Sequence, residues 1–233
     1  EIAARLLEAL AEPFTLIGAQ VSISASMGIA MFPEDGRDME TLMQHADMAM
    51  FKAKNDGRGQ AKFFSTEMSQ SAQERMALET ALRLALKTGQ LWLQYQPQVE
   101  LNTGRLYGVE ALARWRHPVL GNISPVRFIP LAEDCGLIGD LGKWALNEAC
   151  RQLSEWRKAG IMICVVSVNL SATSFHDPHL PQIIASTLDR YDLTPQDLTV
   201  EITESVLLDT NPNTLKTINA IHDLGVRLSM DDF

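Results

Sequence analysis

The alternation of short apolar runs with amphipathic stretches between residues 91 and 233 constrains the fold most strongly. The apolar runs predict β-strands, and the stretches between them have the spacing of helices. Strands that alternate with helices favour a parallel sheet with right-handed crossovers. The predicted strands are 91–96, 106–115, 165–171, 198–205 and 226–233, and the predicted helices are 125–135, 139–159, 180–191 and 212–224.

Acidic and amide residues stand at the carboxyl ends of several of these strands. In a (β/α)8 barrel, this end of the strands forms the active-site face. A complete barrel of roughly 250 residues would need about three more strands than are predicted here. We therefore expect an α/β fold that contains an incomplete TIM-like (β/α)8 barrel. The polar residues at its strand ends are Glu110, Asn169, Glu201, Glu204, Asp231 and Asp232.

The first 65 residues have a different pattern, typical of a separate α+β part. A long connecting helix is predicted to follow, although its apolar residues do not form one clean stripe. We expect domains at 1–65 and 90–233, joined by a linker helix at 66–89. Within the first part, the predicted helices are 2–10 and 39–55, and the predicted strands are 21–31 and 62–64.

Composition excludes several classes of protein. Lys and Arg number 20 against 29 Asp and Glu, which gives a formal charge of -9. Proteins that bind nucleic-acid polymers are usually basic, so no nucleic-acid partner is expected. No apolar run approaches the ~20 residues of a membrane span, and no signal peptide is expected before the first predicted helix.

The three cysteines, Cys135, Cys150 and Cys164, stand singly and without metal-ligand spacing. An odd number of isolated cysteines argues against a disulfide framework. Reduced cysteines are typical of cytoplasmic proteins, so a cytoplasmic location is expected. This expectation is compatible with upstream segments that attach the parent protein to the inner membrane.

The period of two along a strand decides which polar residues share a face. Glu110 and Arg114 lie on one side of their strand, and the same alternation turns Glu201 inward. Asp231 and Asp232 are adjacent in sequence, so both reach one site only if the chain bends at the strand end.

Carboxylate and amide oxygens are hard ligands that suit Mg²⁺ or Mn²⁺. Two such ions about 3.5–4 Å apart are the usual arrangement for attack on a phosphodiester. Arg114 would hold a phosphate group, because its guanidinium is always charged and forked. The sequence thus predicts a two-metal site for phosphodiester hydrolysis.

Several motifs in residues 75–233 resemble the EAL domain. They are Glu110-Ala-Leu112 with Arg114, Ser167-Val-Asn-Leu-Ser171, Glu201-Ile-Thr-Glu204 and Asp231-Asp-Phe233. EAL domains hydrolyse the bacterial second messenger cyclic di-GMP to the linear dinucleotide pGpG with Mg²⁺ or Mn²⁺.

The resemblance implies a role for each matching residue. Metal ligands would be Glu110, Asn169, Glu201, Asp231 and Asp232, and the catalytic set would be Glu110, Glu204, Asp231 and Asp232. Glu204 would steady the loop after the double aspartate, Arg114 would contact a substrate phosphate, and Gln96 would touch the ligand. The family's later lysine, glutamate and glutamine follow the double aspartate, so this stretch alone is expected to be inactive.

The first 65 residues resemble the C-terminal part of a GGDEF, or diguanylate cyclase, domain. The matching stretches are 24–30, 33–36 and 46–54, with Gly57 and Arg58. The resemblance implies that Lys54 and Arg58 approach the phosphates of GTP. A helix C-terminus with complementary cations explains the same two residues.

Three functions remain open at this stage. The first is a cyclic di-GMP phosphodiesterase, the second a receptor that holds cyclic di-GMP without cleaving it, and the third a bifunctional protein with diguanylate cyclase activity. Both families commonly dimerise, so a homodimer is expected.

Overall fold

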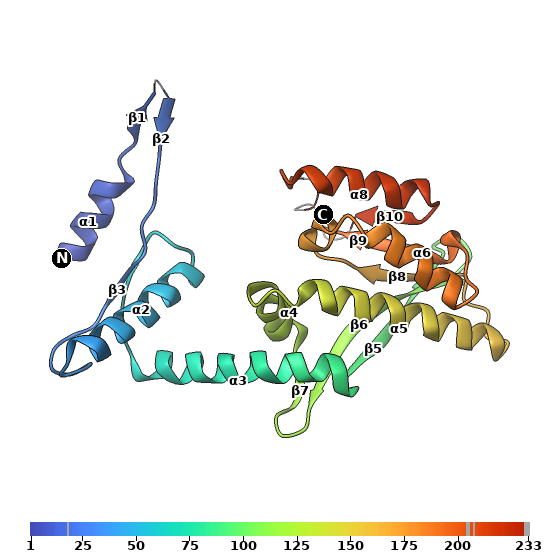
Figure 1. The fold of residues 1–233 in the computed structure, drawn as a ribbon, viewed down its shortest axis with the longest axis horizontal. Helices are drawn as coiled ribbons and strands as arrows, with labels where there is room; N and C mark the ends of the chain where they lie inside the picture. The colour runs from blue at the N-terminus through green and yellow to red at the C-terminus, as the bar shows by residue number, and fades with distance from the viewer. Residues whose placement is uncertain (18, 204–205, 207, 231–233) are drawn as a thin grey trace. The chain divides into compact units, whose positions relative to one another are not determined.

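The computed structural model describes residues 1–17, 19–203, 206 and 208–230. The chain divides into two compact units, Glu1–Leu78 and Glu79–Phe233, and this division falls inside the long helix α3, Thr66–Thr88 (Figure 1). The helix predicted at 66–89 forms as one continuous helix that ends at Thr88. The predicted domain boundaries stay a prediction.

The first unit contains two small sheets in its described part. One is an antiparallel hairpin of β1 and β2, and the other pairs β3 in parallel with β4. The prediction of one strand over 21–31 is wrong, because β2 ends where this stretch begins and β3 pairs with a different partner. The elements are α1 Ile2–Ala11, β1 Phe14–Leu16, β2 Ala19–Val21, β3 Met27–Ile29, α2 Met39–Asn55 and β4 Ala61–Phe63.

Helix α2 has the predicted bounds because its ends are well capped. At its start, the Asp38 carboxylate accepts a hydrogen bond from the backbone N–H of Thr41 at 2.8 Å, which satisfies one of the free N–H groups of the first turn. The helix packs directly against β3 at Gly28. A Cβ at Gly28 would lie 1.8 Å from the carbonyl oxygen of Ala46, so only glycine allows this approach.

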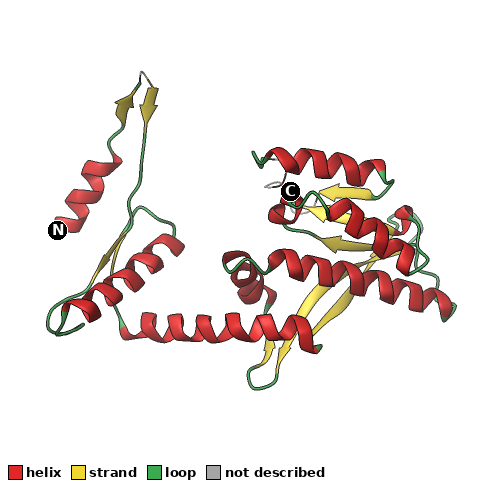
Figure 2. Ribbon diagram, in the orientation of Figure 1, coloured by secondary structure: helices red, strands yellow, loops and turns green. Residues whose placement is uncertain are grey.

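The second unit is built on a sheet with six strands among the described residues, in the order β10-β9-β8-β6-β5, with β7 also paired to β6 (Figure 2). Strands β6, β8, β9 and β10 are parallel. The strands are β5 Leu91–Val99, β6 Leu106–His117, β7 Gly121–Ile123, β8 Val165–Asn169, β9 Leu198–Ile202 and β10 Arg227–Met230.

The expectation of a parallel sheet holds for β6, β8, β9 and β10, whereas β5 and β7 both pair with β6 antiparallel. Strand β5 pairs with β6 antiparallel, from Leu91 opposite Trp115 to Val99 opposite Leu106. The reason is the connection between them: residues 100–105 form a short turn, whereas a parallel crossover needs a dozen or more residues.

Helices cover one face of this sheet. In the hydrophobic core, α5, α6 and α8 pack against the face of the sheet that carries the odd-numbered residues of β6 and the even-numbered residues of β8 and β9. Leu146, Val168 and Val200 are examples of its buried residues. Among the described helices, none has the length and apolar character needed to cross a membrane. The helical elements are α4 Pro125–Asp134, α5 Ile138–Lys158, η1 Ala172–His176, α6 Leu180–Arg190, η2 Pro195–Asp197 and α8 Pro212–Asp223.

Several predicted strands are shorter in the structure. Strand β8 ends at Asn169, because the chain then enters η1, whose N-cap is Ser171. Strand β9 ends at Ile202, and the described part of β10 begins at Arg227 and ends at Met230. Residues 231–233 of the predicted strand 226–233 lie outside the described residues.

Candidate active site

Three of the predicted metal ligands lie on neighbouring strands of the second unit. Glu110 of β6 is opposite Ser167 of β8, and Asn169 of β8 is opposite Glu201 of β9. The apolar neighbours of these three residues point into the helix-covered core. Because side chains alternate along a strand, Glu110, Asn169 and Glu201 share the opposite, polar face.

Asn169 and Glu110 are in direct contact across β6 and β8. The Asn169 amide nitrogen Nδ2 donates a hydrogen bond to Glu110 Oε1 at 2.7 Å. This bond uses the amide nitrogen and leaves the amide oxygen Oδ1 as the group of Asn169 that can accept a hydrogen bond or ligate a cation.

Glu201 is the most enclosed of the three, with 8% of its surface exposed. The Gln98 side chain on β5 reaches it from across the polar face, with Nε2 3.4 Å from Glu201 Oε1. A carboxylate this enclosed needs polar or cationic partners, because burying an ionised group without them is costly.

Arg114 follows Glu110 on the same side of β6. Its Nε donates to Gln94 Oε1 at 2.8 Å, and its Nη1 donates to the backbone oxygen of Ala113 at 2.9 Å. Gln96, the predicted ligand contact, is exposed and lies opposite Glu110 in the pairing of β5 with β6.

A cavity of about 360 Å³ opens at the carboxyl ends of these strands. Its size is that of a small-molecule site, and it lies where the fold is expected to carry chemistry. Apolar residues of α4 and α5 form much of its wall. The polar residues on its lining are Arg114, Glu133, Asn169, Ser171, Thr173 and Thr203.

The donor set suits a hard divalent cation, since it combines two carboxylates with one amide oxygen. Among the described residues no group of three or more His, Cys, Asp or Glu side chains could hold a metal ion. Asp231, Asp232 and Glu204, which complete the predicted set, lie outside the described residues. The predicted site is therefore only partly described.

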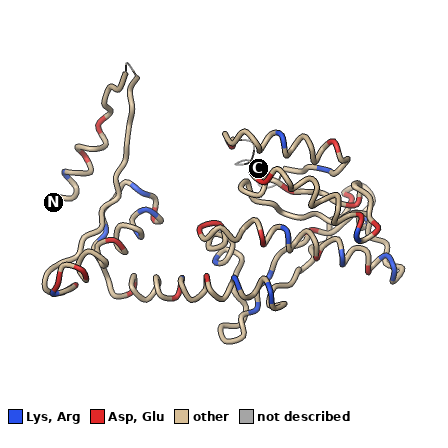
Figure 3. Tube along the Cα trace, viewed as in Figure 1, with Lys and Arg blue, Asp and Glu red and all other residues tan. Residues whose placement is uncertain are grey.

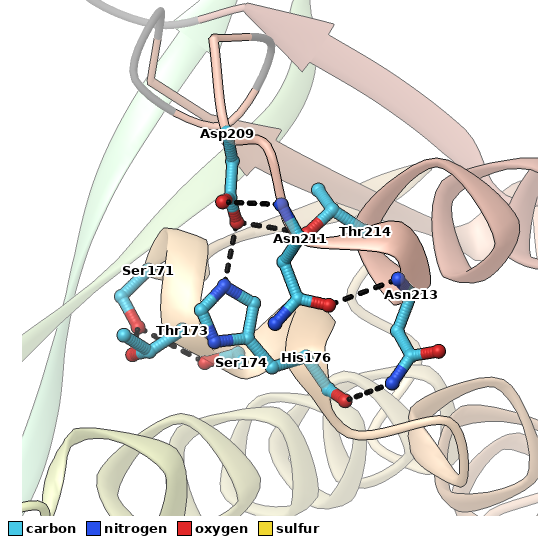
Figure 4. A network of polar contacts seen from close by, with 8 residues as sticks. All are labelled: Ser171, Thr173, Ser174, His176, Asp209, Asn211, Asn213 and Thr214. Atoms are coloured by element: carbon cyan, nitrogen blue, oxygen red, sulfur yellow. Dashed lines mark hydrogen bonds and ion pairs between the residues drawn. The ribbon is translucent and has the colours of Figure 1, made fainter.

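A second polar network joins the chain that follows β8 to the chain that follows β9 (Figure 4). Its centre is Asp209, whose Oδ2 lies 2.5 Å from His176 Nε2 and accepts from Thr214 Oγ1 at 2.8 Å. The backbone N–H of Asn211 donates to Asp209 Oδ1 at 3.0 Å. These donors, with Asn211 first, then Thr214 and His176, lower the pKa of Asp209 to about 2.

Further hydrogen bonds lie in the same two segments of the chain. The Asn213 side chain donates to the backbone oxygen of His176 at 3.4 Å, and the Ser171 hydroxyl lies 3.0 Å from that of Thr173. Below it, Lys143 of α5 pairs with Asp177 at 2.9 Å, and this hydrogen bond lowers the pKa of Asp177. The segments after β8 and β9 are thus bound to each other and to α5.

Charges elsewhere in the second unit are paired locally. Acidic and basic residues alternate along α5 (Figure 3), where Arg151 lies 2.6 Å from Glu148 and 2.5 Å from Glu155. Side-chain pairs three or four residues apart stabilise a helix surface. This helix presents mixed charge rather than a basic stripe.

In the first unit, Lys54 lies in the last turn of α2 and Arg58 follows in the turn, with a positive φ of 59°. Both side chains are exposed. The neighbouring Asp56 pairs with Lys52 at 2.9 Å and Lys62 at 3.1 Å. The role of Lys54 and Arg58 toward GTP stays a prediction.

Sequence reasoning missed Gln94 and Gln98. A signal was available, because Gln94, Gln96 and Gln98 repeat with period two and therefore share one face of β5. That face is the one that carries Glu110 and Arg114, since directly opposed residues of an antiparallel pair lie on the same side.

Comparison with known proteins gives two family matches. Residues 79–233 match the EAL domain, and residues 1–60 match the diguanylate cyclase, GGDEF domain. The predicted resemblance to both families is confirmed.

The curated relatives match over the whole chain. The bifunctional diguanylate cyclase/cyclic di-GMP phosphodiesterase MucR of Pseudomonas aeruginosa is 41% identical over 100% of the chain and 34% of its own length. The cyclic di-GMP phosphodiesterase PdeR of Escherichia coli is 38% identical over 100% of the chain and 35% of its own length. The chain thus spans about a third of the length of these relatives.

A solved structure supports the same assignment. The MucR phosphodiesterase in complex with c-di-GMP is 42% identical, covers 67% of this chain and 64% of its own, and superposes with a TM-score of 0.63. The prediction of a TIM-like barrel agrees with this match, and the match of residues 1–60 to the GGDEF domain agrees with the prediction for the first part. The chain belongs to the EAL domain family, with a GGDEF domain segment ahead of the EAL domain.

Proposed function

We propose that the natural protein carrying these residues is a cyclic di-GMP phosphodiesterase that hydrolyses its substrate to pGpG. The observation that carries the proposal is the contact between Asn169 and Glu110, with Glu201 on the next strand. Of these side chains, Asn169 lines the cavity, and Arg114 lines it as well. Relatives named as cyclic di-GMP phosphodiesterases support the same substrate.

Glu110, Asn169 and Glu201 are proposed to hold Mg²⁺ or Mn²⁺, together with Asp231 and Asp232. The described oxygens fit such ions because they are hard donors. When bound, divalent ions supply a water of lowered pKa and neutralise charge on the phosphate. The hydrogen bond from Asn169 fixes one oxygen of Glu110 and orients the amide oxygen of Asn169 as a ligand.

The other site residues are proposed to act on the substrate. Arg114 holds a phosphate oxygen with its remaining N–H groups, and Gln96 contacts the ligand from β5. Glu204 steadies the loop that bears the double aspartate. The apolar wall of the cavity, from α4 and α5, excludes water from the flank of the bound dinucleotide.

The GGDEF segment supports a second candidate, diguanylate cyclase activity in the same protein. The specific observation is its match to residues 1–60, together with a relative named as bifunctional. Lys54 and Arg58 would then contact the phosphates of GTP. A cytoplasmic homodimer is the form in which we expect the protein to work.

The test is an assay of the full-length natural protein with cyclic di-GMP and Mg²⁺ or Mn²⁺, with pGpG separated by chromatography. We expect pGpG to form with either metal and to disappear with EDTA. Tight binding without pGpG would contradict hydrolysis and make the protein a receptor. A parallel incubation with GTP tests the cyclase, which is supported only if cyclic di-GMP accumulates.

A further inference from the structure

The guanidinium of Arg114 is held at two points. Its Nε donates to Gln94 Oε1 at 2.8 Å, and its Nη1 donates to the oxygen of Ala113 at 2.9 Å. A guanidinium has five N–H donors in a rigid fork. The donors that these two bonds leave over are all on the terminal nitrogens Nη1 and Nη2.

Gln94 reaches Arg114 along the diagonal of an antiparallel pair. Gln94 is opposite Leu112, and Trp92 is opposite Arg114. Diagonal neighbours lie about 7–8 Å apart at the backbone, within reach of long side chains. The two polar side chains therefore meet on the same face of β5 and β6.

Gln94 and Arg114 differ in their relation to the cavity. Arg114 is part of its lining, whereas Gln94 is not among the described residues that line it. The hydrogen bond to Arg114 gives Gln94 a route by which it can act on a ligand in this cavity.

We propose that Gln94 is a positioning residue that fixes Arg114 with its terminal N–H groups ready for a phosphate oxygen of the substrate. The inference rests on the proposed function and adds a residue to it. A free arginine side chain loses much rotamer freedom when it binds a ligand. Gln94 removes part of that loss in advance, because Arg114 is already held by its Nε before substrate arrives.

The test is a double-mutant cycle in the full-length natural protein, with the variants Gln94→Met, Arg114→Met and both together. Gln94→Met keeps the length of the side chain and removes the acceptor. We expect it to raise KM for cyclic di-GMP about three- to tenfold and to change kcat less than about twofold. In the Arg114→Met background, the same change should alter KM by less than about twofold.

Controls separate positioning from folding. Gln73→Met replaces an exposed glutamine on α3 and should leave KM unchanged. Thermal unfolding of each variant checks the fold, and Gln94→Ser is a second variant that must reproduce the rise in KM. The dissociation constant for cyclic di-GMP, measured by calorimetry, should follow KM.

Two results would overturn the inference alone: an unchanged KM in Gln94→Met, or an equal rise in KM with and without Arg114. In both cases the unaltered protein still hydrolyses its substrate. If the unaltered protein neither hydrolyses nor binds cyclic di-GMP, the proposed function fails as well. If the unaltered protein binds cyclic di-GMP without hydrolysing it, the double-mutant cycle uses dissociation constants in place of KM, and the same fold-changes are expected.

Discussion

Asn169 and Glu110, 59 residues apart in sequence, are joined by a hydrogen bond of 2.7 Å across β6 and β8. An amide donor beside a carboxylate is favourable without any cation, because the amide N–H offsets the negative charge. A second carboxylate in the same place would instead need a cation between the two.

Asn169→Asp tests this relationship. It places a carboxylate against Glu110, so we expect a lower Tm than the unaltered protein at pH 7 in EDTA, with a larger gain in Tm on addition of Mg²⁺. Thermal unfolding with and without the metal measures both effects. Asn102→Asp, in the exposed turn after β5, is the matched control and should change neither value. Equal Tm values for Asn169→Asp and the unaltered protein in EDTA would contradict the contact.

Asp209 predicts a pH dependence of stability. Its pKa falls from 3.8 to about 2 in the folded protein, through Asn211 first, then Thr214 and His176. Because the pKa of Asp209 is lower in the folded protein than in the unfolded chain, the ionised carboxylate stabilises the fold fully at pH values above the unfolded pKa. This stabilisation is lost as the pH falls toward 2.

The variant Asp209→Asn should therefore be less stable than the unaltered protein at about pH 5, and the difference should shrink below about pH 4. Urea unfolding at a series of pH values gives this difference. The exposed Asp189→Asn on α6 serves as control. A difference that does not change with pH would show that the Asp209 carboxylate is not held by these donors.

The ion pair of Arg157 with Asp197 lies at the end of the sheet opposite to the cavity, so we expect its loss to affect stability and not activity. Arg157 makes two bonds to the Asp197 carboxylate, at 2.6 and 2.9 Å, and Thr194 donates to the same carboxylate from its N–H at 2.7 Å. This cluster lies at the amino-terminal end of β9, away from the cavity.

Arg157→Met should lower the free energy of unfolding by about 2 kcal/mol, because it leaves a largely enclosed carboxylate with fewer donors. The kcat/KM of the folded variant should stay unchanged. Urea unfolding and an assay at low temperature check the two statements. The exposed neighbour Lys158→Met should alter neither, and a large loss of kcat/KM in Arg157→Met would contradict the assignment.

The different burial of the cysteines predicts the order in which a thiol reagent modifies them. Cys150 is fully buried, and burial raises the pKa of its thiol to about 12, whereas Cys164 is exposed. Thiolate is the reactive form, so iodoacetamide should label Cys164 first and Cys150 only after unfolding in urea. Mass spectrometry of the digested protein identifies the modified residue. Rapid labelling of Cys150 in native protein would contradict the packing of α5.

Sequence patterns were sufficient to predict a helix or strand correctly where residues close in sequence mark both of its ends. Helix α2 has its predicted bounds, Met39–Asn55, because Asp38 and the Asp56-Gly57 turn mark its ends. The face shared by Glu110 and Arg114 also followed from the period of two. These features depend on residues close to each other in sequence.

Other features depend on long-range pairing and could not be read from local patterns. An apolar run predicts a strand but not its direction, so the antiparallel pairing of β5 was missed. The split of 21–31 arises because its two ends pair with different partners. The hydrogen bonds from Arg114 to Gln94 and from Gln98 to Glu201 require the register of β5, which the sequence does not specify.

The measurement that tests the central claim most directly is the rate of pGpG formation by Glu110→Gln in the full-length natural protein. This substitution keeps the size of the side chain and removes the charge that the proposed metal site needs, while Glu8→Gln on α1 is the exposed control. We predict that Glu110→Gln lowers kcat at least about a hundredfold and weakens Mn²⁺ binding in calorimetry, as loss of a metal ligand should. Unchanged hydrolysis by folded Glu110→Gln would contradict the account.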